Sequence, residues 1–235
     1  MPAAAPLIAL VGSDGAGKST VGAALLAWMR QQRPTELCHL GKQSGNVGRA
    51  IARWPIVGRG FDRALDRKTE KANAPAGPGA LPALVIYLFS LRRVRRFRRM
   101  MRIRASGTAI LADRFPQTEL ASAIDAPGFA GKGTRGWLAR VLARRERRHF
   151  DRMTAELPDL VIRLTVDLAT AVARKPDHRP SALGNKIATL SQLRFGGAPI
   201  VDIDATQPLE RVLDQAKQAI TEVLAAYGGD RKGAL

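Results

Sequence analysis

The stretch VGSDGAGKST, residues 11–20, directly follows a short apolar run near the start of the chain. Within it, GSDGAGKS matches the pattern G-x-x-x-x-G-K-[ST] at every fixed position. Glycines let the backbone curl so that successive amides point at phosphate oxygens, and a following helix adds the positive end of its dipole. The stretch therefore predicts a phosphate-binding loop between a buried strand and a helix.

The rest of the chain alternates between predicted strands and helices. Apolar residues recur near helical spacing from residue 18 to residue 30, directly after the loop. Short apolar runs predict strands at residues 7–11, 36–40, 108–112, 160–166 and 199–203. This alternation predicts one α/β domain over residues 1–235, with three layers, in which helices cover both faces of a parallel sheet.

The last predicted helix has the clearest pattern in the sequence. Its apolar residues step at i, i+3, i+4 and i+7 from residue 209 to residue 227. Thr206 is the predicted N-cap, and Gly228 and Gly229 are expected to end the helix.

The charge of the chain is strongly positive and unevenly distributed. The chain has 235 residues, with 38 Lys and Arg against 20 Asp and Glu, a formal charge of +18. A field of that sign attracts phosphates, nucleic acid or anionic lipid. Eight arginines lie within residues 92–104 and seven more within residues 135–152.

Targeting and redox features indicate a cytoplasmic protein. The longest apolar run, residues 80–91, is shorter than the roughly 20 residues that cross a bilayer. The start of the chain lacks the basic flank of a secretory signal. The single cysteine, Cys38, excludes an internal disulfide and agrees with a reducing compartment.

The phosphate loop has predicted chemistry as well as shape. Lys18 can reach the β- and γ-phosphates of a nucleotide, for which ATP is the first choice, and the Ser19 hydroxyl can ligate Mg²⁺. Asp14 lies where it can face a second ligand. Switches, motors and kinases share such loops, so the loop alone does not define a reaction. The residues expected to bind the nucleotide are Gly12, Ser13, Asp14, Gly15, Ala16, Gly17, Lys18, Ser19 and Thr20.

A second group of candidates follows the predicted strand at residues 108–112. Asp113 and Arg114 come directly after this strand, at the carboxyl edge of the sheet, where open α/β folds bind ligands. A carboxylate and a guanidinium at that edge favour a kinase. The alternative is an N-cap and an exposed charge in an ordinary turn.

On these residues the sequence resembles the thymidylate kinase family. The resemblance implies a nucleoside monophosphate kinase fold with a five-stranded parallel sheet, and a mobile lid at about residues 174–186. The segments that carry it are GSDGAGKST (12–20), ILADRF (110–115), PDLVIRLTVD (158–167), the arginine-bearing segment 174–179 and VDIDATQPLERVLDQ (201–215).

The resemblance also implies roles for individual residues. Asp113 would organise the Mg²⁺ shell through water, together with Ser19, and Arg114 would grip the phosphate of the acceptor. Asp14 would lie near the transferred group. Arg174 and Arg179 resemble lid arginines that meet the migrating phosphoryl, although both could instead be solvated surface charges. With Lys18, the predicted catalytic set is Lys18, Asp14, Asp113, Arg114, Arg174 and Arg179.

The middle of the chain departs from the family. Residues 40–48 read LGKQSGNVG where the family has a Glu-Pro-Gly type of segment. The helix predicted around residues 88–104 lacks the acidic partner of an Asp-Arg pair, so Arg92 or Arg93 stands in for the arginine alone. Residues 41–105 are therefore interpreted as a divergent acceptor-side insertion.

The two arginine-rich segments leave several interpretations open. On residues 92–104 the arginines could be solvated, line an acidic acceptor site, contact an anionic membrane or bind nucleic acid with Phe97 or Trp137 stacking on bases. Residues 137–152 could cover the acceptor site or form the face of a homodimer.

These observations give three ordered hypotheses for the function. The first is a phosphotransferase that uses Mg²⁺ and ATP on an acidic, phosphorylated small-molecule acceptor, with a thymidylate-like nucleoside monophosphate as first choice. The second changes the acceptor to a sugar or lipid-linked glycan at an anionic membrane surface. The third, an ATP-dependent nucleic-acid-binding module, ranks last because the sequence contains no recognised nucleic-acid-binding motif.

Overall fold

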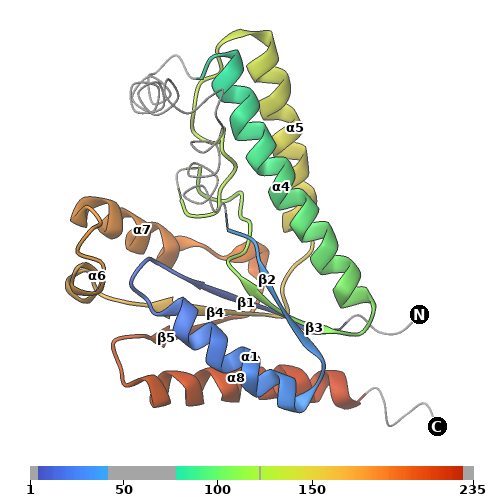
Figure 1. Ribbon diagram of the computed structural model, residues 1–235, viewed down its shortest axis with the longest axis vertical. Helices are drawn as coiled ribbons and strands as arrows, with labels where there is room; N and C mark the ends of the chain where they lie inside the picture. The colour runs from blue at the N-terminus through green and yellow to red at the C-terminus, as the bar shows by residue number, and fades with distance from the viewer. Residues whose placement is uncertain (1–4, 42–77, 122, 230–235) are drawn as a thin grey trace, which may run out of the picture.

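The computed structural model has a five-stranded, all-parallel sheet with the strand order β2-β3-β1-β4-β5. It describes residues 5–41, 78–121 and 123–229. This architecture confirms the predicted α/β fold class with its parallel sheet (Figure 1). The strands are β1 Leu7–Gly12, β2 Thr35–His39, β3 Ala109–Asp113, β4 Leu160–Thr165 and β5 Ile200–Asp204.

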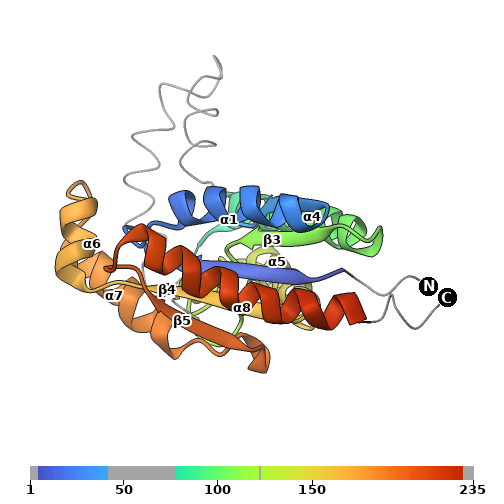
Figure 2. The ribbon, with the colours of Figure 1, turned by 90° about the horizontal axis from the view of Figure 1, so that it is seen from below.

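Helices cover both faces of this sheet. Helices α1 and α8 lie together on one side, and the long pair α4 and α5 lies on the other side and projects beyond the sheet (Figures 1 and 2). We call the α4–α5 pair the arm. The helical elements are α1 Lys18–Gln32, α4 Ala80–Ala105, α5 Gly136–Thr154, α6 Leu168–Arg174, α7 Pro180–Gln192, the 3-10 turn Phe195–Gly197 and α8 Leu209–Gly229.

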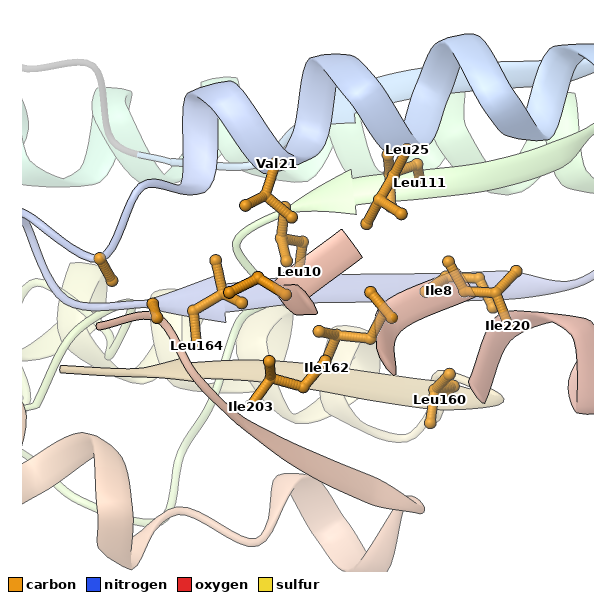
Figure 3. Close-up of a cluster of buried hydrophobic side chains, with 14 of the residues drawn as sticks. Ile8, Leu10, Val21, Leu25, Leu111, Leu160, Ile162, Leu164, Ile203 and Ile220 are labelled. Atoms are coloured by element: carbon orange, nitrogen blue, oxygen red, sulfur yellow. The ribbon is translucent and has the colours of Figure 1, made fainter. Parts of the chain in front are cut away.

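The core consists of one apolar layer on each face of the sheet. In the central strand β1, Ile8 and Leu10 pack in the layer beneath α1 and α8, whereas Leu7, Ala9 and Val11 pack in the layer beneath the arm. Figure 3 shows the first of these layers. All six residues of β1 are buried, which explains why a parallel strand appears in the sequence as a continuous apolar run.

The predicted strands and helices agree with the structure except at their ends. Each strand begins or ends within one or two residues of its predicted position. The N-cap prediction was wrong, because α8 begins at Leu209 and the amide of Val212 bonds to the carbonyl of Pro208. The amide and hydroxyl of Thr206 instead donate to Asp204, at 2.9 and 2.7 Å, and form the turn after β5. The helix ends at Gly229, as the two glycines predicted, and both of them are its last residues.

A buried carboxylate joins the arm to the loop that follows β3. Glu146 of α5 is fully buried and accepts hydrogen bonds from the amides of Gly128 and Phe129, each at 2.9 Å, and from the hydroxyl of Ser90 on α4. Three donors offset the cost of removing a carboxylate from water. Glu146 therefore fastens both helices of the arm to the part of the loop at Gly128 and Phe129.

A second carboxylate joins elements far apart in the chain. Asp159, just before β4, accepts from the amide of Leu7 at 2.6 Å, from Arg104 at 3.0 Å and from the hydroxyl of Tyr227 at 2.8 Å. The guanidinium of Arg104 also donates to the carbonyl of Ala5 at 2.7 Å. Arg104 is thus a buried structural residue of the arginine-rich helix.

Candidate active site

The phosphate loop lies at the carboxyl end of β1 and leads directly into α1 (Figure 1). Gly15 and Gly17 have positive φ values of 89° and 77°, which residues with a side chain rarely adopt. At Gly15 a Cβ would also lie 3.0 Å from the Cα of Ala171, so α6 packs directly against the loop. The two glycines therefore allow both the curl of the loop and its close contact with α6.

Lys18 folds back along this loop. Its ammonium donates to the carbonyls of Gly12 and Ser13, both at 2.8 Å. Burial, reinforced by the charge of Arg114, lowers the pKa of Lys18 to about 8. The ammonium is thus held at the centre of the loop by two neutral acceptors, which leaves its charge available for an anion.

Asp113 lies beside His39 at the carboxyl ends of two neighbouring strands. The two residues are partners in the β2–β3 register, and Nδ1 of His39 lies 2.5 Å from Oδ2 of Asp113. Burial acts to raise the pKa of Asp113, but the bond to His39 and the charges of Lys18 and Arg114 outweigh it and leave the pKa lowered. Among the described residues, the buried Oδ1 atom of Asp113 has no hydrogen-bond partner. The site therefore contains an ionised carboxylate with one oxygen available to a ligand.

Arg114 turns its guanidinium towards the phosphate loop. Its φ of 70° is unusual for a residue with a side chain and costs on the order of 1 kcal/mol. The guanidinium lies 3.4 Å from Asp14 and 3.7 Å from Asp125. At Gly41 a Cβ would approach Cδ of Arg114 to 2.9 Å, so a glycine at the end of β2 makes room for this side chain.

Asp125 supplies the acidic partner that the sequence of α4 lacks. Arg93 donates to the carbonyl of Asp125 at 2.9 Å and to its carboxylate at 2.7 Å, and Asp125 also contacts Arg114. Arg93 is only 3% exposed and lies over the ring of Phe150, 5.6 Å from its centroid, whereas Arg92 is exposed. Of the two arginines considered from the sequence, Arg93 is therefore the one that the structure brings to this group.

Lys186 of α7 adds a further cation to the phosphate loop. Its ammonium lies 2.5 Å from Oδ2 of Asp14. Burial acts to raise the pKa of Asp14, but the bond to Lys186 and the charges of Lys186, Lys18 and Arg114 outweigh it and leave the pKa lowered. Asp14 thus lies between three cations, a charge balance that favours an added anion.

The two predicted lid arginines occupy different environments. Arg174, at the end of α6, donates to the carbonyls of Gly15 and Ala205, at 3.2 and 3.0 Å, so it lies against the phosphate loop. Arg179 is exposed at the N-cap of α7, and within the described part of the chain its side chain forms no ion pair. The structure brings Arg174 to the site and leaves Arg179 outside it.

A hollow of about 280 Å³ opens beside the loop, between α1 and the start of α8. This is close to the lower end of the range for small-molecule sites, roughly 300–1,000 Å³. Its lining combines backbone of the phosphate loop with the turn after β5. The residues around it are Ala16, Gly17, Thr20, Val21, Arg174, Ala205, Gln207, Leu209 and Val212.

His39, Asp125 and Lys186 were not identified from the sequence. Each comes from an element distant from the phosphate loop, and no local motif marks it. Part of the predicted acceptor-side insertion, residues 42–77, lies outside the described residues. Among the residues that are described, no three His, Cys, Asp or Glu side chains gather as a metal site, and no helix is long and apolar enough to cross a membrane.

The chain is similar over nearly its whole length to curated bacterial proteins. It is 39% identical over 229 residues to the "Uncharacterized ATP-binding protein YghR" of Escherichia coli strain K12, a match that covers 96% of this chain and 90% of that protein. It is 40% identical over 225 residues to the "Uncharacterized ATP-binding protein YghS" of the same strain, covering 93% of this chain and 94% of the relative. No protein-family model matches the chain.

Proposed function

The chain belongs to the family of ATP-binding proteins that includes YghR and YghS of Escherichia coli, and from this premise we propose that it is an ATP-dependent phosphotransferase. It would move the γ-phosphoryl of ATP to a phosphorylated acceptor. The observation that carries the proposal is the convergence of Lys18, Arg114 and Arg174 on one phosphate loop that already carries a carboxylate, Asp14.

The donor side of the proposal rests on the loop and its hollow. The loop amides and Lys18 would bind the β- and γ-phosphates of ATP. The hollow between α1 and α8 would receive the remainder of the nucleotide, beside Arg174. The names of the relatives support ATP as the nucleotide.

Two residues are suited to hold Mg²⁺. Ser19 begins α1 next to Lys18, and the orphaned Oδ1 atom of Asp113 is an oxygen donor of the kind this cation prefers. When bound, the metal would neutralise charge that builds up on the phosphates. Asp113 would act through Oδ1, because Oδ2 is engaged by His39, and we propose that a metal-bound water lies between Oδ1 and the cation.

The acceptor side of the proposal rests on Arg114 and its support. Arg114 would bind the phosphate of the acceptor, while Asp125 and Arg93 hold its guanidinium in place. A thymidylate-like nucleoside monophosphate is the first choice of acceptor. A phosphorylated sugar or lipid-linked glycan uses the same contacts, and the arginine-rich arm favours it as the second choice.

Catalysis would consist of positioning and charge stabilisation. An oxygen of the acceptor attacks the γ-phosphorus, the bond from that phosphorus to the β–γ bridging oxygen breaks, and ADP leaves. Lys18, Arg114 and Arg174 would stabilise the negative charge on the transferring group. In this structure Arg179 is exposed at the N-cap of α7, away from the phosphate loop. Its proposed contact with the transferring group therefore requires a movement of the lid, residues 174–186.

Transfer from γ-labelled ATP tests the proposal directly. The purified protein is incubated with Mg²⁺, labelled ATP and, one at a time, thymidylate, other nucleoside monophosphates and phosphorylated sugars. A labelled diphosphate product supports the proposal and identifies the acceptor class. ATP that binds with Lys18-dependent affinity but yields labelled inorganic phosphate with every acceptor would contradict the kinase assignment.

A further inference from the structure

One side of the arm carries two parallel lines of arginines. Helices α4 and α5 contain fourteen arginines and two acidic residues. Residues three, four or seven apart share a helix face, which brings three arginines of each helix onto one side. All six are exposed, and within the described residues none of them forms an ion pair. They are Arg95, Arg98 and Arg102 of α4 and Arg145, Arg148 and Arg152 of α5.

A groove with an apolar floor runs between these two lines. Its volume is about 520 Å³, and the floor contains Val94, Phe97, Met101 and Met153. Three of these side chains are at least 95% buried, so the floor belongs to the core of the arm. The volume lies in the range of about 300–1,000 Å³ that holds small organic groups.

The rim of the same groove is basic. Arg98, Arg102 and Arg152 stand around the opening, and Glu156 is the acidic residue in its lining. The positive charge of the rim acts on His149, which also lines the groove. Burial and the charges of Arg98 and Arg152 lower the pKa of this histidine. An apolar floor inside a cationic rim is complementary to a molecule with an anionic head and a hydrocarbon chain.

We propose that this side of the arm binds the surface of an anionic phospholipid bilayer. The six arginines contact the phosphate head groups, and the groove takes part of one acyl chain. Nucleic acid fits less well, because Phe97 is 4% exposed and offers no ring face to a base, and the exposed Trp137 lies in the first turn of α5, outside the lining of the groove.

The position of the groove leaves the candidate active site accessible. The lining comes from the carboxyl-terminal halves of α4 and α5 and from Glu156. These helices end at Ala105 and Thr154, shortly before β3 and β4 begin. The groove thus lies towards the amino ends of the strands, whereas the phosphate loop lies at the carboxyl ends. Docking does not depend on the proposed phosphotransfer, and either can fail without the other.

Vesicle binding with matched variants tests the proposal. The full chain is sedimented with vesicles of phosphatidylcholine, with and without phosphatidylglycerol, at low and high salt. The variant Arg98→Ala/Arg102→Ala/Arg152→Ala should bind the anionic vesicles about 100-fold more weakly, at about fivefold per arginine. The control Arg92→Ala/Arg99→Ala/Arg147→Ala removes the same charge from other sides of the same helices and should change binding less than about threefold.

The floor and the rim can also be tested separately. Met101→Gln keeps every charge and should weaken vesicle binding about fivefold, because the groove no longer favours an acyl chain. In solution, short-chain phosphatidylglycerol should raise the pKa of His149, which is measured by NMR titration with and without the lipid.

Three outcomes would overturn the docking proposal. One is the absence of binding to phosphatidylglycerol vesicles at low salt. Another is an equal loss of binding in the rim variant and its control, which would mean that net charge alone acts. The third is binding to single-stranded polynucleotide, lost in the rim variant, without binding to vesicles, which would assign the surface to nucleic acid.

Discussion

The phosphate loop and the arm use charged residues in different ways. In the loop, the residues proposed to bind phosphate form the contiguous stretch 12–20, and the backbone of this stretch positions both its amides and the ammonium of Lys18. In the arm, the important contacts join residues far apart in the chain, such as Arg93 with Asp125 and Ser90 with Glu146. A local motif can therefore be read from the sequence, whereas a site made by distant pairs depends on the fold.

Replacing Lys18 should have the largest effect, a loss of activity at the phosphate loop without a loss of stability. Lys18→Ala removes the cation that we propose binds the β- and γ-phosphates, so kcat/KM should fall about 1,000-fold, equal to about 4 kcal/mol. The Tm should stay within about 2 °C of the unmodified protein, because the side chain bonds only to two carbonyls of the loop. Steady-state kinetics and thermal unfolding measure the two quantities. Lys132→Ala, at an exposed position, is the control, and activity retained in Lys18→Ala would contradict the role of the loop.

Replacing Glu146 should instead destabilise the packing of the arm against the loop after β3. In Glu146→Ala the amides of Gly128 and Phe129 and the hydroxyl of Ser90 lose their acceptor, which should lower the free energy of unfolding by about 3 kcal/mol. For a chain of this size the Tm should fall by about 8 °C. Calorimetry measures the loss, with exposed Glu222→Ala as the control, and equal stability of the two variants would show that the arm does not need this carboxylate.

Replacing Asp125 tests how the arm and the phosphate loop are joined. Asp125→Asn removes the charge between Arg93 and Arg114, so Arg114 loses its orientation. The acceptor KM should rise about 30-fold, equal to about 2 kcal/mol, while the Kd for ATP stays unchanged. Arg92→Ala, a change at an exposed neighbour of Arg93, should leave both constants unchanged. If ATP affinity fell as much as acceptor affinity in Asp125→Asn, Asp125 would have a general structural role rather than a positioning role.

A change of pH should have the smallest effect, and it tests whether the charge of Lys18 contributes to ATP binding at the phosphate loop. Burial lowers the pKa of Lys18 to about 8, so the side chain is charged at pH 7 and largely neutral at pH 9. Neutral Lys18 must take up a proton to pair with phosphate, and the affinity for ATP should therefore fall about tenfold from pH 7 to pH 9. Equilibrium binding at the two pH values measures this. The decrease should be absent in Lys18→Arg, whose guanidinium stays charged throughout.

Most of the fold could be predicted because its signals are local. Buried parallel strands appear as short apolar runs, and α8 has a clean helical period, so each was located within a few residues. The end of α8 that was misplaced depends on a competing local bond, in which Thr206 donates to Asp204 instead of capping the helix. The turn-forming propensity of threonine alone does not decide whether Thr206 caps α8 or bonds to Asp204 in the turn after β5.

The candidate site could be predicted where a motif or a predicted strand end marks the residue. Asp14, Lys18, Asp113 and Arg114 follow strands β1 and β3, and the sheet order brings these two strands together. The choice between Arg92 and Arg93 depends on which side of α4 faces the core, and adjacent helical residues point about 100° apart. That choice was not available from the sequence, because the buried partner, Asp125, lies in a loop more than thirty positions away.

The central position of β1 has a consequence for the way the protein is made. This strand is synthesised before both of its neighbours, β3 and β4, so Leu7 has no partner until Ile110 has been added. A growing chain therefore carries an unpaired, wholly apolar strand through the synthesis of α1, β2 and the arm's first helix. Pairings between such distant segments form slowly. We therefore expect the emerging chain to need shielding from other chains during translation, because an unpaired apolar strand is prone to aggregate.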